Sequence, residues 1–156
     1  MQSNDKYMKE TIRLAKIAYT NGDVPVGAIV VDDKGKIIGK GYNTKEINNN
    51  PLDHAEMIAI AQACKTKKDW RLNECILYTT LEPCLMCTGA ILHSRIKTIF
   101  FSLADPKFGT IVSNNKILKE NSFNHKTEYH QGILQEKVKI MMQEFFIKIR
   151  KKDNCQ

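Results

Sequence analysis

The chain has 156 residues, a length that suits a single domain over 1–156 and is short for two domains. Apolar residues make up 42% and charged residues 26%, which excludes disordered, collagen-like and low-complexity classes. The formal net charge of +7 is uneven, since residues 107–152 hold 10 basic and 4 acidic side chains. A basic half favours a polyanionic partner such as nucleic acid, although charge alone fits a solvated Lys-rich surface better.

The sequence shows neither a membrane span nor an export signal. The longest apolar or Gly/Pro run, 24–31, is too short to cross a bilayer, and residues 1–9 contain no apolar segment. Five cysteines is an odd number for such a chain, so a disulfide framework is not expected. We therefore expect a cytoplasmic protein without membrane association, whose reduced cysteines are free to bind metal or to pack in the core.

Apolar spacing predicts that helices and strands alternate along the chain. In chain order the predicted elements are a helix over 4–20, a β-hairpin of strands 26–31 and 36–42, a polar loop over 43–50, a helix over 54–64, a strand over 76–81, a helix over 83–94, a strand over 96–103, a long loop with a short helix over 104–126, and an edge strand over 127–131. This order predicts one sheet flanked by helices, an α/β layered domain.

The chain is predicted to end in a helix over 134–152. One stripe at helical spacing is apolar and is expected to face the core; it consists of Leu134, Val138, Met141, Phe145 and Ile149. The last turn of this helix is basic and contains Lys148, Arg150, Lys151 and Lys152.

Two segments carry side chains that bind metals: His54-Ala55-Glu56 and Pro83-Cys84-Leu85-Met86-Cys87. Thiolate and imidazole are ligands that zinc prefers. Cys84 and Cys87 are three residues apart, so in a helix they share one face. With Pro83 at the first helical position, both sulfurs lie near the first turn, where the helix dipole favours the thiolate. If the helices near 54 and 83 begin at the same edge of the sheet, His54 and the two cysteines converge.

Glu56 is predicted to have a different role from His54. It lies roughly 200° around a helix from His54, so it is not a natural co-ligand and suits a proton carrier on the substrate side of the metal. Three protein ligands leave the fourth zinc position open, which is typical of catalytic zinc. Two thiolates make the water on such a zinc less acidic, and a nearby carboxylate base compensates for this.

A Cys-x-x-Cys pair alone also fits a structural zinc site, a redox pair or two core cysteines. No thioredoxin-like Trp-Cys-x-x-Cys context is present. A structural zinc needs a fourth ligand, and no candidate is spaced in a pair as in zinc fingers; the candidates are Cys64, Cys75, His93, His125 and His130. The combination of H-x-E and P-C-x-x-C, 30 residues apart and each near a predicted helix start, instead matches zinc nucleobase deaminases, in which zinc-bound hydroxide attacks the carbon that carries the amine.

Longer motifs extend over about residues 8–150: Val24-Pro25-Val26-Gly27-Ala28, Gly41-Tyr42-Asn43, Arg71-Leu72, Thr80-Leu81-Glu82-Pro83-Cys84-Leu85-Met86-Cys87-Thr88-Gly89-Ala90, His93-Ser94-Arg95, Asp105-Pro106-Lys107-Phe108-Gly109, Asn124-His125 and Phe145-Phe146. With 54–56, these motifs resemble the family of bacterial tRNA-specific adenosine deaminases. One departure is Leu52-Asp53, where the family usually has Thr-Ala; Asp53 is still able to cap the helix.

The resemblance implies a cytidine-deaminase-like three-layer α/β/α sandwich with a central five-stranded mixed sheet. It implies a homodimer that holds one Zn²⁺ per chain and converts the wobble adenosine of a tRNA anticodon to inosine by hydrolytic attack at C6. Its implied site comprises His54, Cys84 and Cys87 as zinc ligands, Glu56 as the proton shuttle, Asn43 on the flipped nucleotide, and Asp105, Arg150 and Lys151 along the RNA. From the residues alone, Asn43 also fits a loop cap and Asp105 an Asx-turn.

Two other functions remain open at this point. A deaminase of a free base or nucleotide, such as guanine, cytidine or dCMP, would use the same zinc site but has no use for the basic half. A zinc-stabilised RNA-binding module without catalysis is the second alternative, and the substitution Glu56→Ala distinguishes it from an enzyme.

Overall fold

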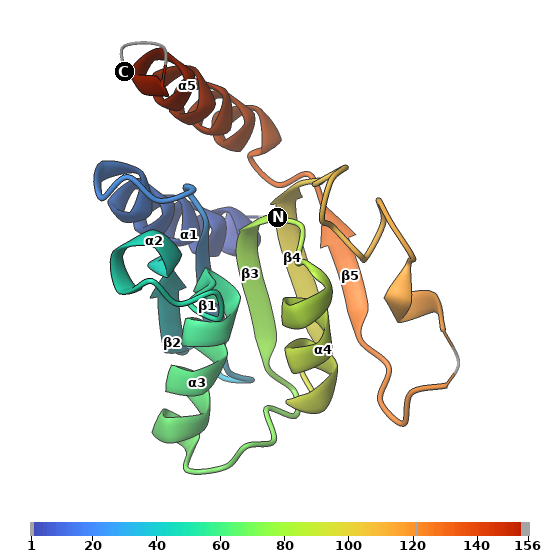
Figure 1. The fold of residues 1–156 in the computed structure, drawn as a ribbon. Helices are drawn as coiled ribbons and strands as arrows, with labels where there is room; N and C mark the ends of the chain where they lie inside the picture. The colour runs from blue at the N-terminus through green and yellow to red at the C-terminus, as the bar shows by residue number, and fades with distance from the viewer. Residues whose placement is uncertain (1, 121, 154–156) are drawn as a thin grey trace.

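Five strands form one mixed sheet in the computed structural model, which describes residues 2–120 and 122–153 (Figure 1). The strands are β1 (Gly27–Val31), β2 (Ile37–Tyr42), β3 (Ile76–Leu81), β4 (Thr98–Leu103) and β5 (Glu128–Gln131), in the order β2-β1-β3-β4-β5. β1 is antiparallel to β2 and β3, whereas β3, β4 and β5 run parallel. The predicted five-stranded mixed sheet is therefore confirmed.

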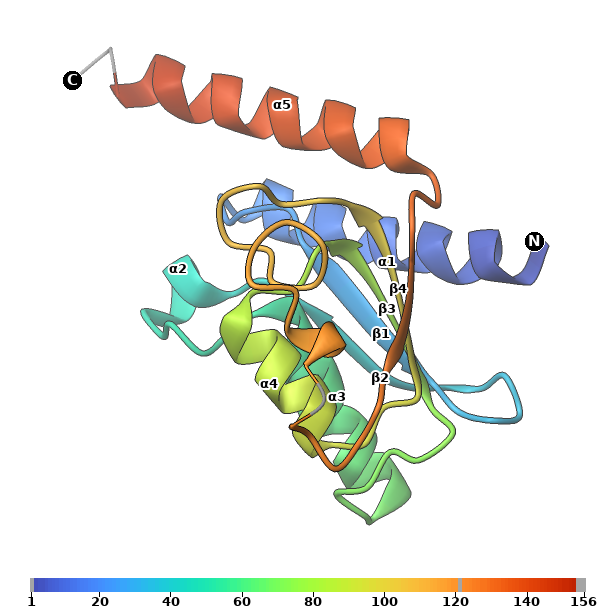
Figure 2. The ribbon, with the colours of Figure 1, turned by 90° about the vertical axis from the view of Figure 1, so that its right-hand side faces the viewer.

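Helices cover both faces of this sheet. α3 (Ala55–Lys67) and α4 (Leu85–His93) pack on one face, and α1 (Gln2–Thr20) and α5 (Gln135–Asp153) on the other (Figure 2). Side chains alternate along β1, so that Ala28 and Val30 join the core under α3 and α4, while Ile29 and Val31 join the core under α1. The fold is therefore the predicted α/β/α sandwich. Among the described residues, no helix is long and apolar enough to span a membrane.

The helix α3 lies unusually close to the neighbouring strand. A Cβ atom at Gly41 of β2 would overlap the carbonyl oxygen of Ala55, the first residue of α3. Glycine at this position lets the helix backbone rest directly on the strand. Because His54 directly precedes Ala55, this contact also keeps His54 close to the end of β2.

The C-terminal helix has the core-facing stripe that the sequence predicts. Val138, Met141 and Phe145 are buried, and α5 begins at Gln135, one residue after the predicted start. The polar loop over 43–50 contains a short helix, α2 (Lys45–Asn48), that its Asn-rich sequence does not predict. The long loop between β4 and β5 holds the short helix that was predicted, as a 3-10 turn over Ile117–Lys119.

Candidate metal centre and active site

The three predicted metal ligands meet at one edge of the sheet. The helices α3 and α4 both begin at this edge, above the carboxyl end of β3 (Figure 1). The Nδ1 atom of His54 lies 3.6 Å from the sulfur of Cys84 and 3.6 Å from the sulfur of Cys87. All three donor atoms lie within 4.8 Å of one another. The predicted convergence is confirmed, and their role as metal ligands stays a prediction.

The backbone at two of these residues differs from the sequence prediction. His54 and Cys84 are the N-caps of α3 and α4, with extended backbone, rather than residues of the first turn. Pro83 therefore precedes the cap and is not the first helical residue. Neither side chain makes a capping hydrogen bond, and the imidazole of His54 and the sulfur of Cys84 instead contact each other.

Asp53 is not the cap of α3 that its position predicts. Its carboxylate accepts hydrogen bonds from the side-chain amides of Asn48 at 2.7 Å and Asn50 at 2.6 Å. Asp53 thus ties together the loop that leads into His54. Because these amides occupy its oxygens, Asp53 does not bond the start of α3, where the N–H of Ala55 donates to Asn43 instead.

The three donor side chains share protons through hydrogen bonds. Hydrogen bonding from Cys87 lowers the pKa of Cys84 to about 4, and His54 adds to this effect. The same bond raises the pKa of Cys87, and the bond to Cys84 raises the pKa of His54. A half-buried set of two sulfurs and one imidazole suits Zn²⁺, which would replace the shared protons.

Glu56 is buried beside this group and is 4% exposed. Its Oε1 accepts a hydrogen bond of 3.4 Å from the hydroxyl of Thr79 in β3, a partner that the sequence did not predict. Burial raises the pKa of Glu56, and the negative charge on Cys84 raises it further. A carboxyl group with a raised pKa is well suited to take up and deliver protons near neutral pH.

The donor group has three members among residues 2–120 and 122–153. The candidates for a fourth ligand lie outside it: Cys64, Cys75, His93, His125 and His130. The Cys64 thiol donates to the carbonyl oxygen of Trp70, and His125 Nε2 bonds the carbonyl oxygen of Ile96. Three protein donors leave a tetrahedral metal one position for water or substrate.

Asn43 and Asp105 both hold the backbone around the site. The Oδ1 atom of Asn43 accepts the N–H of Ala55 at 2.9 Å, while within the described chain its Nδ2 has no hydrogen-bond partner. Asp105 Oδ1 accepts the backbone N–H groups of Lys107 at 3.0 Å and Phe108 at 3.3 Å, the Asx-turn that its sequence permits. Their contacts with a nucleotide stay predictions.

The basic end of α5 is exposed. Lys151, Lys148 and Lys152 line one open hollow together with Glu144 and Ile147. Arg150, in the same turn, is also exposed. This end of the helix lies on the same side of the molecule as α2 (Figures 1 and 2). The candidate RNA contacts Arg150 and Lys151 are therefore on the same side as the loop over 43–50, which precedes His54.

Glu82 is a site residue that sequence reasoning missed. It is 2% exposed, and five donors converge on its two carboxylate oxygens from the loop between β4 and β5. Burial alone would raise the pKa of Glu82, but hydrogen bonds from Ser113, Val112 and Asp105 lower it. The available signal was a charged residue directly after the apolar strand over 76–81. Such a residue is expected to be buried and therefore to have hydrogen-bond partners.

Comparisons with known proteins identify the chain as a deaminase. Residues 2–150 match the MafB19-like deaminase family. The tRNA-specific adenosine deaminase of Bacillus subtilis is 42% identical over 97% of this chain and 94% of its own length. A structure from studies of A-to-I editing by tRNA:A34 deaminases at the wobble position is 30% identical, with a TM-score of 0.83 over 87% of this chain and 98% of that one.

A second kind of deaminase is also similar to this chain. The guanine deaminase of Bacillus subtilis is 32% identical, with a TM-score of 0.62 over 88% of this chain and 90% of that one. The guanine deaminase is the less similar of the two Bacillus subtilis proteins. The chain belongs to the family of bacterial tRNA-specific adenosine deaminases.

Proposed function

We propose that the protein deaminates the wobble adenosine of a tRNA anticodon to inosine, in the cytoplasm, with one zinc ion per chain. The observation that carries this proposal is the three-member donor set beside the buried carboxyl group of Glu56. The 42% identity to a tRNA-specific adenosine deaminase supports adenosine in tRNA as the substrate.

His54, Cys84 and Cys87 are the residues that would hold the zinc ion. When bound, the ion supplies a Lewis acid that makes a water molecule nucleophilic near neutral pH. The half-buried position of the donors limits competing water around the reacting base.

Glu56 moves the protons of the reaction. Its carboxylate takes a proton from the attacking water and delivers it to the ring nitrogen of adenine. Glu56 then takes the proton of the hydroxyl group that has been added to C6 and delivers it to the leaving amine, so that the C–N bond breaks, ammonia departs and a carbonyl group remains at C6. Thr79 holds Oε1 through its hydroxyl and thereby orients the carboxyl group for both transfers.

The proposed substrate fits the surroundings of the donor set. A base in an anticodon loop is partly unstacked, so turning it into a buried pocket costs little free energy. The Nδ2 group of Asn43 is available to donate a hydrogen bond to the flipped nucleotide, because only Oδ1 is used by Ala55. Asp105, Arg150 and Lys151 are proposed to lie along the RNA, with the two basic residues near its phosphates.

We also propose that the protein is a homodimer, as the family resemblance implies. Light scattering of the purified protein measures this directly, and a monomer mass at micromolar concentration would reject it.

The decisive experiment combines one substitution with four substrates. Glu56→Ala should keep zinc and RNA binding but lose on the order of a hundred-fold or more in inosine formation, the usual scale for an acid–base group. The wild-type protein is assayed for ammonia release from an anticodon stem-loop, guanine, cytidine and dCMP. Comparable turnover of a free base or nucleotide would favour the alternative supported by the similarity to guanine deaminase. Unchanged activity of Glu56→Ala would reject its role as the proton shuttle.

A further inference from the structure

An exposed aromatic side chain stands beside the metal-binding turn. Phe108 is 61% exposed, the highest value among the exposed large hydrophobic residues of the described chain. Leu85, the first residue of α4, is 59% exposed. Exposed apolar groups that gather beside an active site are typical of surfaces that bind a partner or ligand.

Phe108 is tied to the metal-binding turn through the backbone. The next residue, Gly109, forms an isolated antiparallel bridge with Cys84, and the N–H of Thr110 donates to the carbonyl oxygen of Pro83 at 3.1 Å. A Cβ atom at Gly109 would overlap the carboxylate of Glu82, so glycine is required for this close approach. Phe108 therefore has a fixed place next to the donor set.

A buried carboxylate also holds the loop that carries Phe108. Glu82 Oε1 accepts the backbone N–H groups of Ile111 at 2.9 Å, Val112 at 2.7 Å and Ser113 at 3.0 Å. Its Oε2 accepts the N–H of Asp105 at 2.9 Å and the hydroxyl of Ser113. These bonds join both ends of the loop to the end of β3.

The tip of the loop uses its backbone groups internally. Asp105 Oδ1 accepts the N–H of Phe108, and Asn114 Nδ2 donates to the carbonyl oxygens of Pro106 and Gly109, each at 3.0 Å. What the tip presents outward is the Phe108 ring, with the Nζ of Lys107 at 5.2 Å from the ring centroid. A preorganised aromatic ring beside a cation is a recurring arrangement for binding single-stranded nucleic acid.

We propose that Phe108 is a stacking platform for the base next to the target adenosine, and that Lys107 contacts the adjoining phosphate. This inference rests on the proposed RNA substrate. The target base is bound beside the three donor atoms. The adjacent nucleotide of the strand therefore lies close to Cys84 and Gly109. The cation of Lys107 beside the ring favours RNA over an apolar protein partner at this position.

The test uses an anticodon stem-loop RNA with 2-aminopurine on either side of the target adenosine. Wild-type protein should quench the fluorescence at one of the two positions, because stacking on an aromatic ring quenches this base. Phe108→Ala should lose the quenching and raise KM by roughly ten-fold or more, with a smaller change in kcat. Phe108→Trp should restore both, since the larger ring also stacks.

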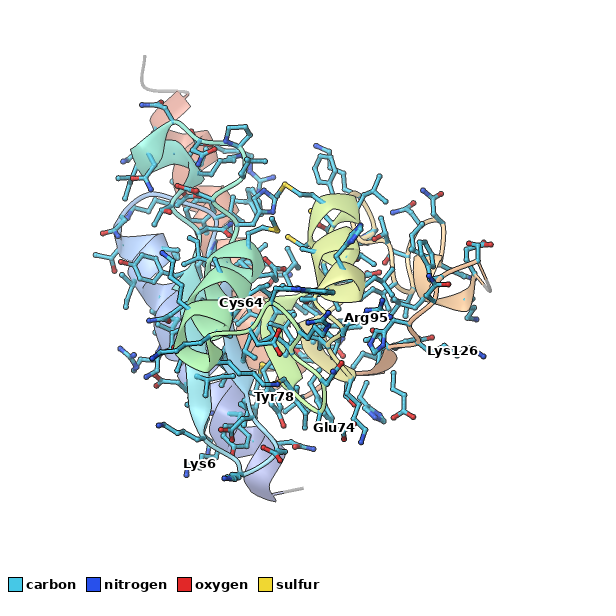
Figure 3. The ribbon with its side chains drawn as sticks, turned by 90° about the horizontal axis from the view of Figure 1, so that it is seen from below. Lys6, Cys64, Glu74, Tyr78, Arg95 and Lys126 are labelled. Atoms are coloured by element: carbon cyan, nitrogen blue, oxygen red, sulfur yellow. The ribbon has the colours of Figure 1, made fainter. Side chains whose placement is uncertain are left out.

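Phe123→Ala is the matched control. Phe123 is 42% exposed, but it lies two residues before His125, which bonds Ile96 at the opposite end of β4. Lys126, three residues after Phe123, lies at the edge of the molecule in the view from below (Figure 3), and the chain enters β5 at the lower end of the sheet, away from the starts of α3 and α4 (Figure 1). Quenching and KM should equal those of the wild type.

Three results would overturn the proposal. They are wild-type KM and quenching in Phe108→Ala, full rescue by Phe108→Leu, and a change of oligomeric mass in Phe108→Ala with unchanged RNA binding. The second result indicates a general apolar contact, and the third an interface between copies of the chain. If the wild-type protein itself forms no inosine in the stem-loop, the proposed function fails instead, so the two failures are distinguishable.

Discussion

The buried floor of the site and its exposed rim differ in how their positions are fixed. The floor consists of Cys87, Glu56 and Asn43, which are 0%, 4% and 8% exposed. Each has a fixed partner: Cys87 bonds His54, Glu56 accepts from the Thr79 hydroxyl, and Asn43 accepts from the backbone of Ala55. The rim consists of Phe108, which extends into solvent from a loop, together with the proposed RNA contact Lys151 at the exposed end of α5. Substitutions in the floor should therefore change metal content and kcat, whereas substitutions in the rim should change KM and the salt dependence of binding.

The largest effect is expected for Cys87→Ser. The hydroxyl group of serine is a poor zinc ligand at neutral pH, so bound zinc and inosine formation should fall to background. Soluble yield should fall as well, because metal binding contributes to folding. Zinc content by elemental analysis measures the first effect, and a strong chelator should reproduce the loss of activity in the wild type.

Cys64→Ser is the control for this substitution. Cys64 is a partly buried thiol outside the donor group, and a serine hydroxyl is also able to donate to the carbonyl oxygen of Trp70. It should keep full zinc and activity. Full zinc occupancy in Cys87→Ser would refute the assignment of this residue as a ligand.

The second largest effect is expected for Glu82→Gln, which loosens the rim without touching the donor atoms. In glutamine an NH2 group replaces one of the two carboxylate oxygens. It cannot accept the two or three hydrogen bonds, of the five in total, that this oxygen accepts in Glu82. Leaving these groups unpaired should cost about 1–3 kcal/mol of stability and raise KM for the stem-loop. Zinc content should stay unchanged, and chemical denaturation measures the loss of stability.

Glu74→Gln provides the exposed counterpart. Glu74 pairs with Lys97 at the surface, where an ion pair contributes roughly 0–1 kcal/mol. An equal loss of stability in the two variants would show that the hydrogen bonds of Glu82 have no special weight.

Short-range signals explain why much of the floor was predictable from the sequence. Apolar spacing gave the order of helices and strands, and the spacing of Cys84 and Cys87 gave a shared direction for two sulfurs. Helix starts were predicted less well, since His54 and Cys84 act as caps without side-chain capping bonds. At α3, the carboxylate of Asp53 is occupied by the side-chain amides of Asn48 and Asn50, a contact that helix propensities do not include.

The basic end of α5 was predicted from the sequence, but the loop that carries Phe108 was not, because its conformation depends on contacts between distant residues. Glu82 bonds residues 23 to 31 positions away, and no periodic pattern marks such a carboxylate. The bridge between Cys84 and Gly109 likewise forms only when β3 and β4 are paired. The exposure of Phe108 follows from this folded loop and has no counterpart in local spacing.

Asn43 lies in the floor and is predicted to contact the substrate, and two substitutions distinguish the roles of its Oδ1 and Nδ2 atoms. Asn43→Asp keeps an oxygen for the N–H of Ala55 but removes the Nδ2 donor, whereas Asn43→Ala removes both. If Nδ2 binds the nucleotide, both variants should lose roughly ten-fold or more in kcat/KM, the scale of about 1–3 kcal/mol for an unpaired polar group. If Asn43 only caps α3, Asn43→Asp should retain activity and thermal stability, and the predicted nucleotide contact would be wrong.

The smallest effects are expected at the basic end of α5, where Arg150 and Lys151 are exposed and line or flank an open hollow. Each phosphate contact releases counterions, so Arg150→Ala or Lys151→Ala should lower the slope of log affinity against log salt by about 0.7–0.9. Affinity for the stem-loop should fall a few-fold at low salt and change little at high salt, while kcat stays near the wild-type value. Lys137→Ala, at the other end of the same helix, removes the same charge and should leave the slope unchanged. The net charge falls equally in all three variants. An equal reduction of the salt slope in all of them would indicate a general electrostatic effect of the basic half. A reduction confined to the Arg150 and Lys151 variants would locate the RNA on the side of the rim.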